Sequence, residues 1–154
     1  MDKITVKAPA KINLTLDVLG RRENGYHDLR MIMQTIDLCD EVTIEQITAE
    51  EITLSMNKDL PDGCPMQKNL VYRAAILMKE RYALPDGMNI ILTKNIPAAA
   101  GLAGGSSDCA ATLLGINELY NLGLSLDELC DIGVTLGADV PFCIRKGTML
   151  SEGI

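Results

Sequence analysis

The stretch NIPAAAGLAGGSSDCAATLLG, Asn95 to Gly115, decides how this chain is built. Three glycines fall within five residues, two serines follow, and an alanine- and leucine-rich run begins at once. That run predicts a helix from about Ser106 to Tyr120, and Met88–Thr93, rich in Ile and Leu, predicts a strand just before the turn. The order is therefore strand, glycine-rich turn, helix.

This order predicts a binding site for an anion. The start of a helix leaves its first N–H groups unpaired and carries a partial positive charge. Glycines let the preceding backbone curl so that N–H groups converge and an anion comes close, and the hydroxyls of Ser106 and Ser107 lie at the same end. The stretch thus favours a phosphate-binding loop, with a tight turn packed under a small-residue helix as the alternative.

Two known glycine motifs do not match the loop. A Walker A loop needs a lysine directly after its last glycine, and none follows here. The dinucleotide fingerprint G-x-G-x-x-G needs glycine two residues after Gly101, where this chain has Ala103. The sequence therefore indicates a phosphate loop of another type.

Composition limits the class of protein. The 154 residues suit one compact domain, and 47% hydrophobic with 23% charged residues is an ordinary globular balance. The net charge of −7 disfavours a nucleic-acid partner, which needs a basic surface. No apolar run approaches the roughly 20 residues that cross a bilayer, and the N-terminus lacks the apolar region of a signal peptide, so we expect a cytoplasmic protein without a membrane partner.

Cysteine and histidine do not indicate a metal centre. The five cysteines are scattered without a C-x-x-C pair, and His27 is the single histidine. This pattern favours buried thiols in a reducing compartment over a disulfide framework or a zinc site.

The first half of the chain predicts strands and the second half predicts helices. Asn24-Gly25 is a hairpin-turn signal, Asn69 is a candidate helix cap, and Ser125–Glu128 reads as a capping box. Strands before helices indicate an α+β class rather than a βαβ alternation. The predicted strands are 4–6, 12–18, 29–38, 42–47, 52–56 and 88–93, with another beginning at 147, and the helices are 70–82, 106–120 and 126–136, the last broken by 137–141.

Several segments together resemble one known family. Pro97–Ser107, PAAAGLAGGSS, resembles the P-x-x-x-G-[LM]-x-G-G-S-S loop of the GHMP kinases, which include galactokinase, homoserine kinase and mevalonate kinase. Further matches follow in order over nearly the whole chain: KAPAKINL at 7–14, GYHDL at 25–29, NLVYRA at 69–74 and GADVPF at 137–142. The resemblance implies the GHMP-kinase N-terminal fold, which is like domain 2 of ribosomal protein S5. It also implies that residues 1–154 are the ATP-binding domain and that the family's C-terminal domain is absent.

The resemblance implies an ATP- and Mg²⁺-dependent transfer of a phosphoryl group to a hydroxyl of a small molecule. The combination of motifs is similar to family members that act on a cytidyl diphosphate substrate in non-mevalonate isoprenoid biosynthesis. Asn69 and Lys94 would border the adenine, and Ser107 would approach Mg²⁺. The residues that would bind ATP in the loop are Pro97, Ala98, Ala99, Ala100, Gly101, Leu102, Ala103, Gly104, Gly105, Ser106 and Ser107.

By the same resemblance, Asp139 is the general base on the accepting hydroxyl and Lys11 is the cation that holds it ionised. Taken singly, Asp139 reads as a residue of a helix-end turn and Lys11 as a cation on a strand. Asn13, two residues beyond Lys11, would face the same side of a strand and bind a substrate hydroxyl. Tyr26 would stack on the pyrimidine and His27 would hydrogen-bond the cytosine.

Three alternatives stay open. One is another small-molecule kinase of the family, similar to mevalonate or homoserine kinase. A second is a non-catalytic nucleotide-binding fragment, because a chain that lacks one wall of a two-domain cleft is expected to turn over little by itself. The third is an RNA-binding module with the related ribosomal fold, which the charge of −7 disfavours.

Overall fold

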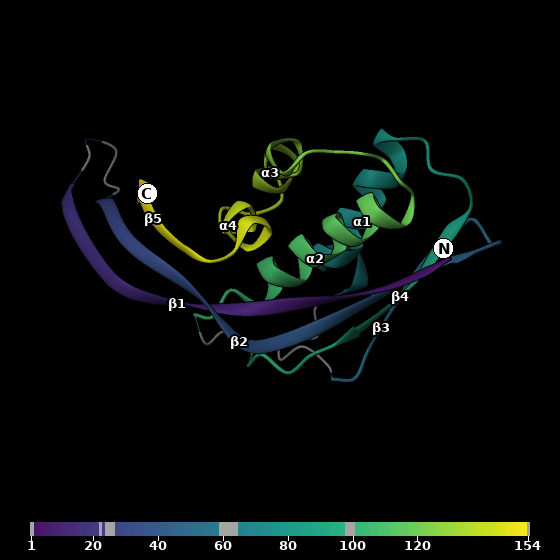
Figure 1. Ribbon diagram of the computed structural model, residues 1–154, viewed down its shortest axis with the longest axis horizontal. Coiled ribbons are helices and arrows are strands. Elements are labelled where there is room, and N and C mark those ends of the chain that lie inside the picture. The colour runs from purple at the N-terminus through teal and green to yellow at the C-terminus, as the bar shows by residue number, and fades with distance from the viewer. Residues whose placement is uncertain (1, 22, 24–26, 59–64, 98–100, 154) are drawn as a thin grey trace.

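The computed structural model describes residues 2–21, 23, 27–58, 65–97 and 101–153. These residues form one sheet with helices packed over one of its faces, as Figure 1 shows. The predicted α+β class is confirmed. The elements are β1 (Lys3–Arg21), β2 (His27–Ile47), β3 (Ile52–Met56), a 3₁₀ turn (Met66–Lys68), α1 (Leu70–Arg81), β4 (Gly87–Thr93), α2 (Gly104–Leu119), α3 (Leu126–Val134), α4 (Val140–Arg145) and β5 (Thr148–Gly153).

The strand β2 organises the sheet, whose order is β1-β2-β4-β3. It pairs with β1 along its whole length, antiparallel, from Lys3↔Glu45 to Arg21↔His27. On its other side, β4 pairs with one end of β2 and β5 with the opposite end. The strand β3 runs parallel to β4 at the edge.

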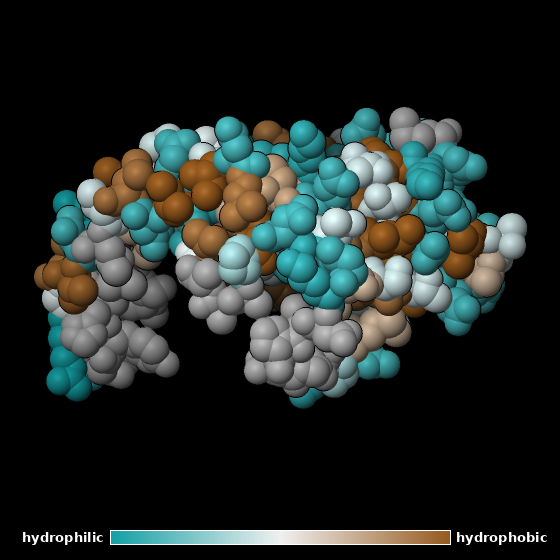
Figure 2. Space-filling model, turned by 90° about the horizontal axis from the view of Figure 1, so that it is seen from below, coloured by the Kyte–Doolittle hydropathy of each residue, from teal (hydrophilic) through white to brown (hydrophobic). Residues whose placement is uncertain are grey.

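The strands β1 and β2 extend past the helices as a ribbon, at the left of Figure 1. Hydrophobic side chains reach the surface toward this end of the molecule in the view from below in Figure 2. In β1, the side chains of Leu14, Val18 and Leu19 are each more than half exposed.

Some predicted boundaries are wrong. Each of the first two strands was predicted as two separate pieces but is continuous. In β1, the pairing register shifts between Pro9 and Lys11, and this irregularity lets the strand continue through a proline. The helix α2 begins at Gly104, two residues before the predicted start, because the glycines themselves take helical geometry.

The helix α4 was not predicted, since Gly137–Pro141 was read as a break. Its proline, Pro141, lies in the first helical turn, where a missing N–H removes no helical hydrogen bond. Two predicted caps are confirmed: Asn69 accepts from the N–H of Val71 at 2.9 Å, and Ser125 forms the capping box of α3 with Glu128.

The core lies between the sheet and the helices α1 and α2. Alternating residues of β2 and β4 point toward the helices, among them Ile44 and Ile90, which are fully buried. The helix α2 lies close to the sheet at Gly115, where a Cβ would lie 2.9 Å from Cδ1 of Ile44 and 3.2 Å from Cγ2 of Val6. This close packing fixes the direction in which α2, and with it the glycine loop, leaves the sheet.

Replacing Gly115 with Ala should lower the free energy of unfolding by about 1–2 kcal/mol, because the added methyl group pushes on Ile44 and Val6. Urea denaturation measures the change. Gly105→Ala is a matched control in the same helix, since its Cβ would meet nothing within 4 Å. Equal stability of the two variants would contradict the close packing of α2 on the sheet.

Candidate active site

The start of α2, at the end of the glycine loop, presents backbone N–H groups for which the described residues provide no acceptor. The N–H of Ser107 donates to the carbonyl of Ala103 at 2.9 Å, which leaves the N–H groups of the three preceding helical residues, Gly104 to Ser106, without an acceptor inside the helix. Gly101 at φ 74° and Ala103 at φ 57° lie in the left-handed region. Such residues turn the backbone so that successive N–H groups face one concavity, where anions bind.

The described part of the loop is open on one side. A Cβ on Gly105 would meet nothing within 4 Å, so a ligand can reach the backbone there. Three of the predicted loop residues, Ala98 to Ala100, lie outside the described residues. Pro97 is exposed at the end of the segment that follows β4.

The loop is attached to the N-terminal strand. The hydroxyl of Ser107 donates to the carbonyl of Pro9 at 2.6 Å, and the N–H of Lys11 donates to the carbonyl of Leu102 at 3.0 Å. Two motifs from the beginning and the middle of the chain are therefore neighbours in space. The hydrogen of the Ser107 hydroxyl is occupied by this bond, and a contact of Ser107 with Mg²⁺ stays a prediction.

The backbone of Lys11 lies at this junction. Lys11 is 6% exposed, and its Nζ donates to Oδ1 of Asn13 at 3.2 Å. The prediction that both side chains share one side of the strand is confirmed by this contact. Asn13 itself is exposed, where a substrate could reach it.

Asp139 lies in the C-terminal part of the chain. It is the residue before α4, and its side chain makes no capping hydrogen bond with that helix. The buried thiol of Cys143 lies one turn later. Burial raises the pKa of this thiol to about 12. The negative charge of Asp139 adds to the rise, and the positive charge of Lys11 opposes it. The helix α4 also contacts β1, the strand that carries Lys11, although the described side chains of Lys11 and Asp139 form no ion pair with each other.

The predicted substrate residues are only partly described. Tyr26 lies outside the described residues. The backbone of His27 opens β2 opposite Arg21, but its side chain is not among those described. The roles of both residues stay predictions.

Lys94 is buried in a group of charges that the sequence did not reveal. Its Nζ donates to Oδ2 of Asp40 and to Oδ2 of Asp108, both at 2.7 Å. Relative exposures are 7% for Lys94, 0% for Asp40 and 2% for Asp108. Since Lys94 faces these carboxyl groups, the predicted contact with adenine has no support from its position and stays a prediction.

The two carboxyl groups differ in protonation. Burial raises the pKa of Asp108 to about 8, and its hydrogen bond with Asp40 adds to the rise, which the charge of Lys94 only partly opposes. Burial also pushes the pKa of Asp40 upward, but hydrogen bonds from Asp108, Lys94 and two backbone N–H groups outweigh it and leave that pKa lowered. At neutral pH, Asp108 therefore holds a proton while Asp40 is ionised beside Lys94.

This difference makes stability depend on pH. The pKa of Asp108 is raised on folding from 3.8 to about 8, so its contribution to stability is complete below its unfolded pKa and is lost as pH rises toward about 8. Asp108→Asn does not titrate. The free energy of unfolding of the unmodified chain, relative to the variant, should fall by about 5 kcal/mol between pH 4 and pH 8, as measured by urea denaturation. A difference that does not change with pH would contradict the protonated carboxyl.

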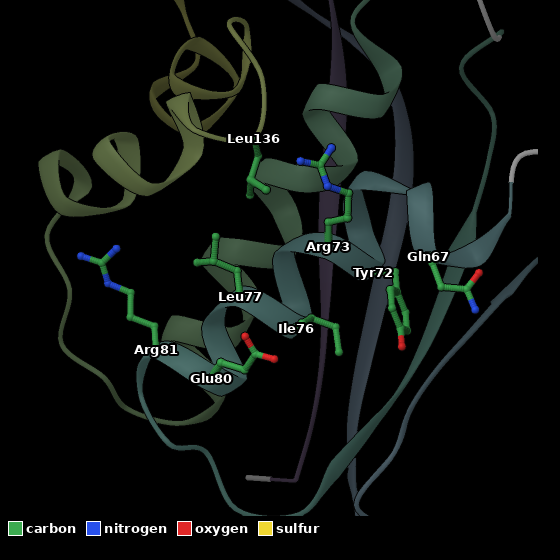
Figure 3. Close-up of a pocket in the computed structure, with 8 residues that line it drawn as sticks. All are labelled: Gln67, Tyr72, Arg73, Ile76, Leu77, Glu80, Arg81 and Leu136. Carbon is green, nitrogen blue, oxygen red and sulfur yellow. The ribbon is translucent and has the colours of Figure 1, made fainter.

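A separate hollow of about 590 Å³ lies along α1, as Figure 3 shows. None of the predicted site residues lines it, and its wall mixes aliphatic with polar and charged side chains. We therefore place the candidate site at the glycine loop. The residues that line the hollow are Gln67, Tyr72, Arg73, Ile76, Leu77, Glu80, Arg81 and Leu136.

The described residues contain no cluster of three His, Cys, Asp or Glu side chains that could hold a metal ion by themselves. Within the same residues, no helix has the length and apolar character needed to span a membrane. The described residues thus place a loop suited to an anion next to the strand that carries the buried Lys11.

The comparisons with known proteins agree with this arrangement. Residues 69–147, more than half of the chain, match the model of the GHMP kinases N terminal domain, and the chain belongs to this family. It is similar to a 4-diphosphocytidyl-2-C-methyl-D-erythritol kinase of Bacillus cytotoxicus, with 53% identity over 98% of this chain and 52% of the relative. The kinase of the same description from Lachnoclostridium phytofermentans is 56% identical over 100% of this chain and 52% of its own length.

Solved structures are similar to this chain over nearly its whole length. A crystal structure of 4-(cytidine 5'-diphospho)-2C-methyl-D-erythritol kinase superposes with a TM-score of 0.84 at 39% identity, over 97% of this chain and 52% of that one. The Methanococcus jannaschii mevalonate kinase superposes with a TM-score of 0.73 at 21% identity, over 97% of this chain and 53% of that one, which shows a shared fold. The chain spans about half the length of the relatives that it matches.

Proposed function

We propose that this chain is the ATP-binding half of a kinase that phosphorylates the 2-hydroxyl of 4-diphosphocytidyl-2-C-methyl-D-erythritol in isoprenoid biosynthesis. One observation supports this most directly: the glycine loop, with its unpaired N–H groups, is fastened to the strand that carries Lys11. The high identity to kinases of that description supports the choice of substrate.

The described residues fit a triphosphate. The N-terminal end of α2 offers N–H donors and the positive end of the helix dipole, and the open side at Gly105 leaves room for phosphate oxygens. Lys11, whose backbone N–H is hydrogen-bonded to the loop at Leu102, carries a full positive charge that would act on the phosphates. Mg²⁺ is typically held by one or two side chains together with substrate phosphates, so the lack of a larger acidic cluster among the described residues agrees with it.

The mechanism assigns each residue one task. Asp139 accepts the proton of the attacking hydroxyl at its carboxylate, and Lys11 stabilises the negative charge that develops on that oxygen. Asn13, hydrogen-bonded to Lys11, orients the substrate. His27 and Tyr26 bind the cytosine. Bound Mg²⁺ would neutralise charge on the phosphates as the phosphoryl group moves.

A chimera tests the proposal. Residues 1–154 replace the matching half of the Bacillus cytotoxicus relative, and the purified chimera receives ATP, Mg²⁺ and one of three alcohols. We expect ADP and a phosphorylated product with the cytidyl substrate, and rates lower by at least about 100-fold with mevalonate or homoserine. A folded chimera without this activity would reject the proposed reaction, and equal rates with all three alcohols would reject the proposed substrate.

The chain alone provides a second measurement. We expect it to bind ATP, which calorimetry with Mg²⁺ detects, but to turn over far more slowly than the chimera. Full turnover by the 154 residues alone would show that they need no second domain for catalysis.

A further inference from the structure

Three ionisable side chains that the proposed mechanism does not use lie buried next to the glycine loop. Asp40 lies in β2 directly before the segment that pairs with β4, Lys94 follows β4, and Asp108 lies one turn inside α2. A buried charge is costly unless it is paired and hydrogen-bonded, so side chains held in this way act on the structure around them.

Asp40 fixes the side of the loop that follows β4. Its Oδ1 accepts from the N–H of Asn95 at 2.5 Å and from the N–H of Ile96 at 2.8 Å. The side chain of Asn95 also donates to the carbonyl of Cys39 at 3.0 Å. The backbone that leaves β4 therefore enters the loop in a direction set by β2.

Lys94 fixes the side of the loop that leads into α2. Its ammonium, already paired with Asp40, donates to Oδ2 of Asp108 at 2.7 Å. A Cβ on Gly104 would lie 3.2 Å from the same ammonium and 3.2 Å from Cγ2 of Ile96. The first residue of α2 therefore packs directly on Lys94, and one ammonium joins both flanks of the loop.

We propose that Asp40, Lys94 and Asp108 form a clamp that sets the spacing of the two flanks of the glycine loop, Asn95–Pro97 and Gly101–Ser107, and so positions the loop's N–H groups for the phosphates of ATP. The inference rests on the proposed function, which makes this loop the nucleotide site. The three clamp residues are positioning residues, because they act through the loop backbone.

The geometry predicts that the same substitution, aspartate to asparagine, has a larger effect at Asp40 than at Asp108. Asp40 uses both oxygens, one for Lys94 and one for two backbone N–H groups, so Asp40→Asn must turn an NH₂ group toward a donor. Asp108 accepts from Lys94 at Oδ2 and in its protonated form is also hydrogen-bonded to Asp40, while its buried Oδ1 has no partner among the described atoms. Asp108→Asn can therefore keep its oxygen toward Lys94, whereas Asp108→Ala cannot.

Amide hydrogen exchange and ATP binding test the clamp in the chain, and steady-state kinetics test it in the chimera. We expect Asp40→Asn to speed exchange about tenfold at Asn95 and Ile96, and to raise both the Kd and the KM for ATP about tenfold while kcat changes less than about threefold. Asp108→Ala should speed exchange at Ser107, whose N–H donates to the carbonyl of Ala103, and Asp108→Asn should keep most of that protection. Asp127→Asn, which breaks the exposed ion pair with Arg145, is the matched control and should change none of these values.

Several outcomes would overturn the clamp. One is unchanged exchange and ATP affinity in Asp40→Asn and Asp108→Ala. Another is a uniform rise in exchange along the whole chain with an unchanged KM, which would indicate only a lower overall stability. If Asp40→Asn does not fold, Asp108→Ala decides with the same readouts. If neither the unmodified chain nor the chimera binds ATP, the proposed function is rejected. The exchange pattern alone would then show whether the three clamp residues hold the flanks of the loop.

Discussion

Replacing Asp139 with Asn should lower kcat of the chimera by about 10³-fold without unfolding it. Asparagine has the same shape but cannot accept the proton of the attacking hydroxyl, and general-base catalysis commonly contributes 10²- to 10⁴-fold. The Asp139 side chain makes no capping hydrogen bond with α4, so its loss removes no bond that holds the helix. Thermal melting should stay within about 2 °C, and the Kd for ATP within about threefold.

Ser125→Ala is the matched control for this substitution. Ser125 also precedes a helix, but its hydroxyl accepts from the N–H of Glu128 at 3.1 Å, so its loss should cost about 1 kcal/mol of stability and leave kcat unchanged. A full rate for Asp139→Asn would show that Asp139 is not the base. A large loss of stability with it would favour the reading of Asp139 as a structural residue of a helix-end turn.

The elements around the site could be predicted wherever the signal is local. The capping roles of Asn69 and Ser125 depend on neighbours two and three residues away, and both predictions are confirmed. The shared orientation of Lys11 and Asn13 follows from the two-residue period of a strand. The α+β class was predicted because strand patterns fill the first half of the sequence and helix patterns the second half.

The clamp could not be predicted in this way. Lys94 is 54 residues from Asp40 and 14 from Asp108, and no periodicity links such positions. Lys94 therefore read as a cation at the entrance of the loop, although it is buried between two carboxyl groups. The continuous β1 was missed for a related reason, because only pairing with β2 shows that the irregularity after Pro9 does not end the strand.

Replacing Gly105 with Ala should separate ATP binding from stability. The added Cβ meets nothing within 4 Å in the chain, and alanine favours a helix over glycine, so the free energy of unfolding should stay the same or rise by up to about 1 kcal/mol. The same Cβ would fill the open side where phosphate oxygens are to approach the backbone. The Kd for ATP should therefore rise about 30-fold, which corresponds to about 2 kcal/mol.

The neighbouring glycine provides the control. Gly104→Ala places its Cβ against Lys94 and Ile96, so it should lower stability by about 1–2 kcal/mol and disturb the clamp. Calorimetry for ATP and urea denaturation, run on both variants, distinguish a blocked site from a strained one. If Gly105→Ala and the larger Gly105→Val both bind ATP as the unmodified chain does, the phosphates do not approach this face of α2.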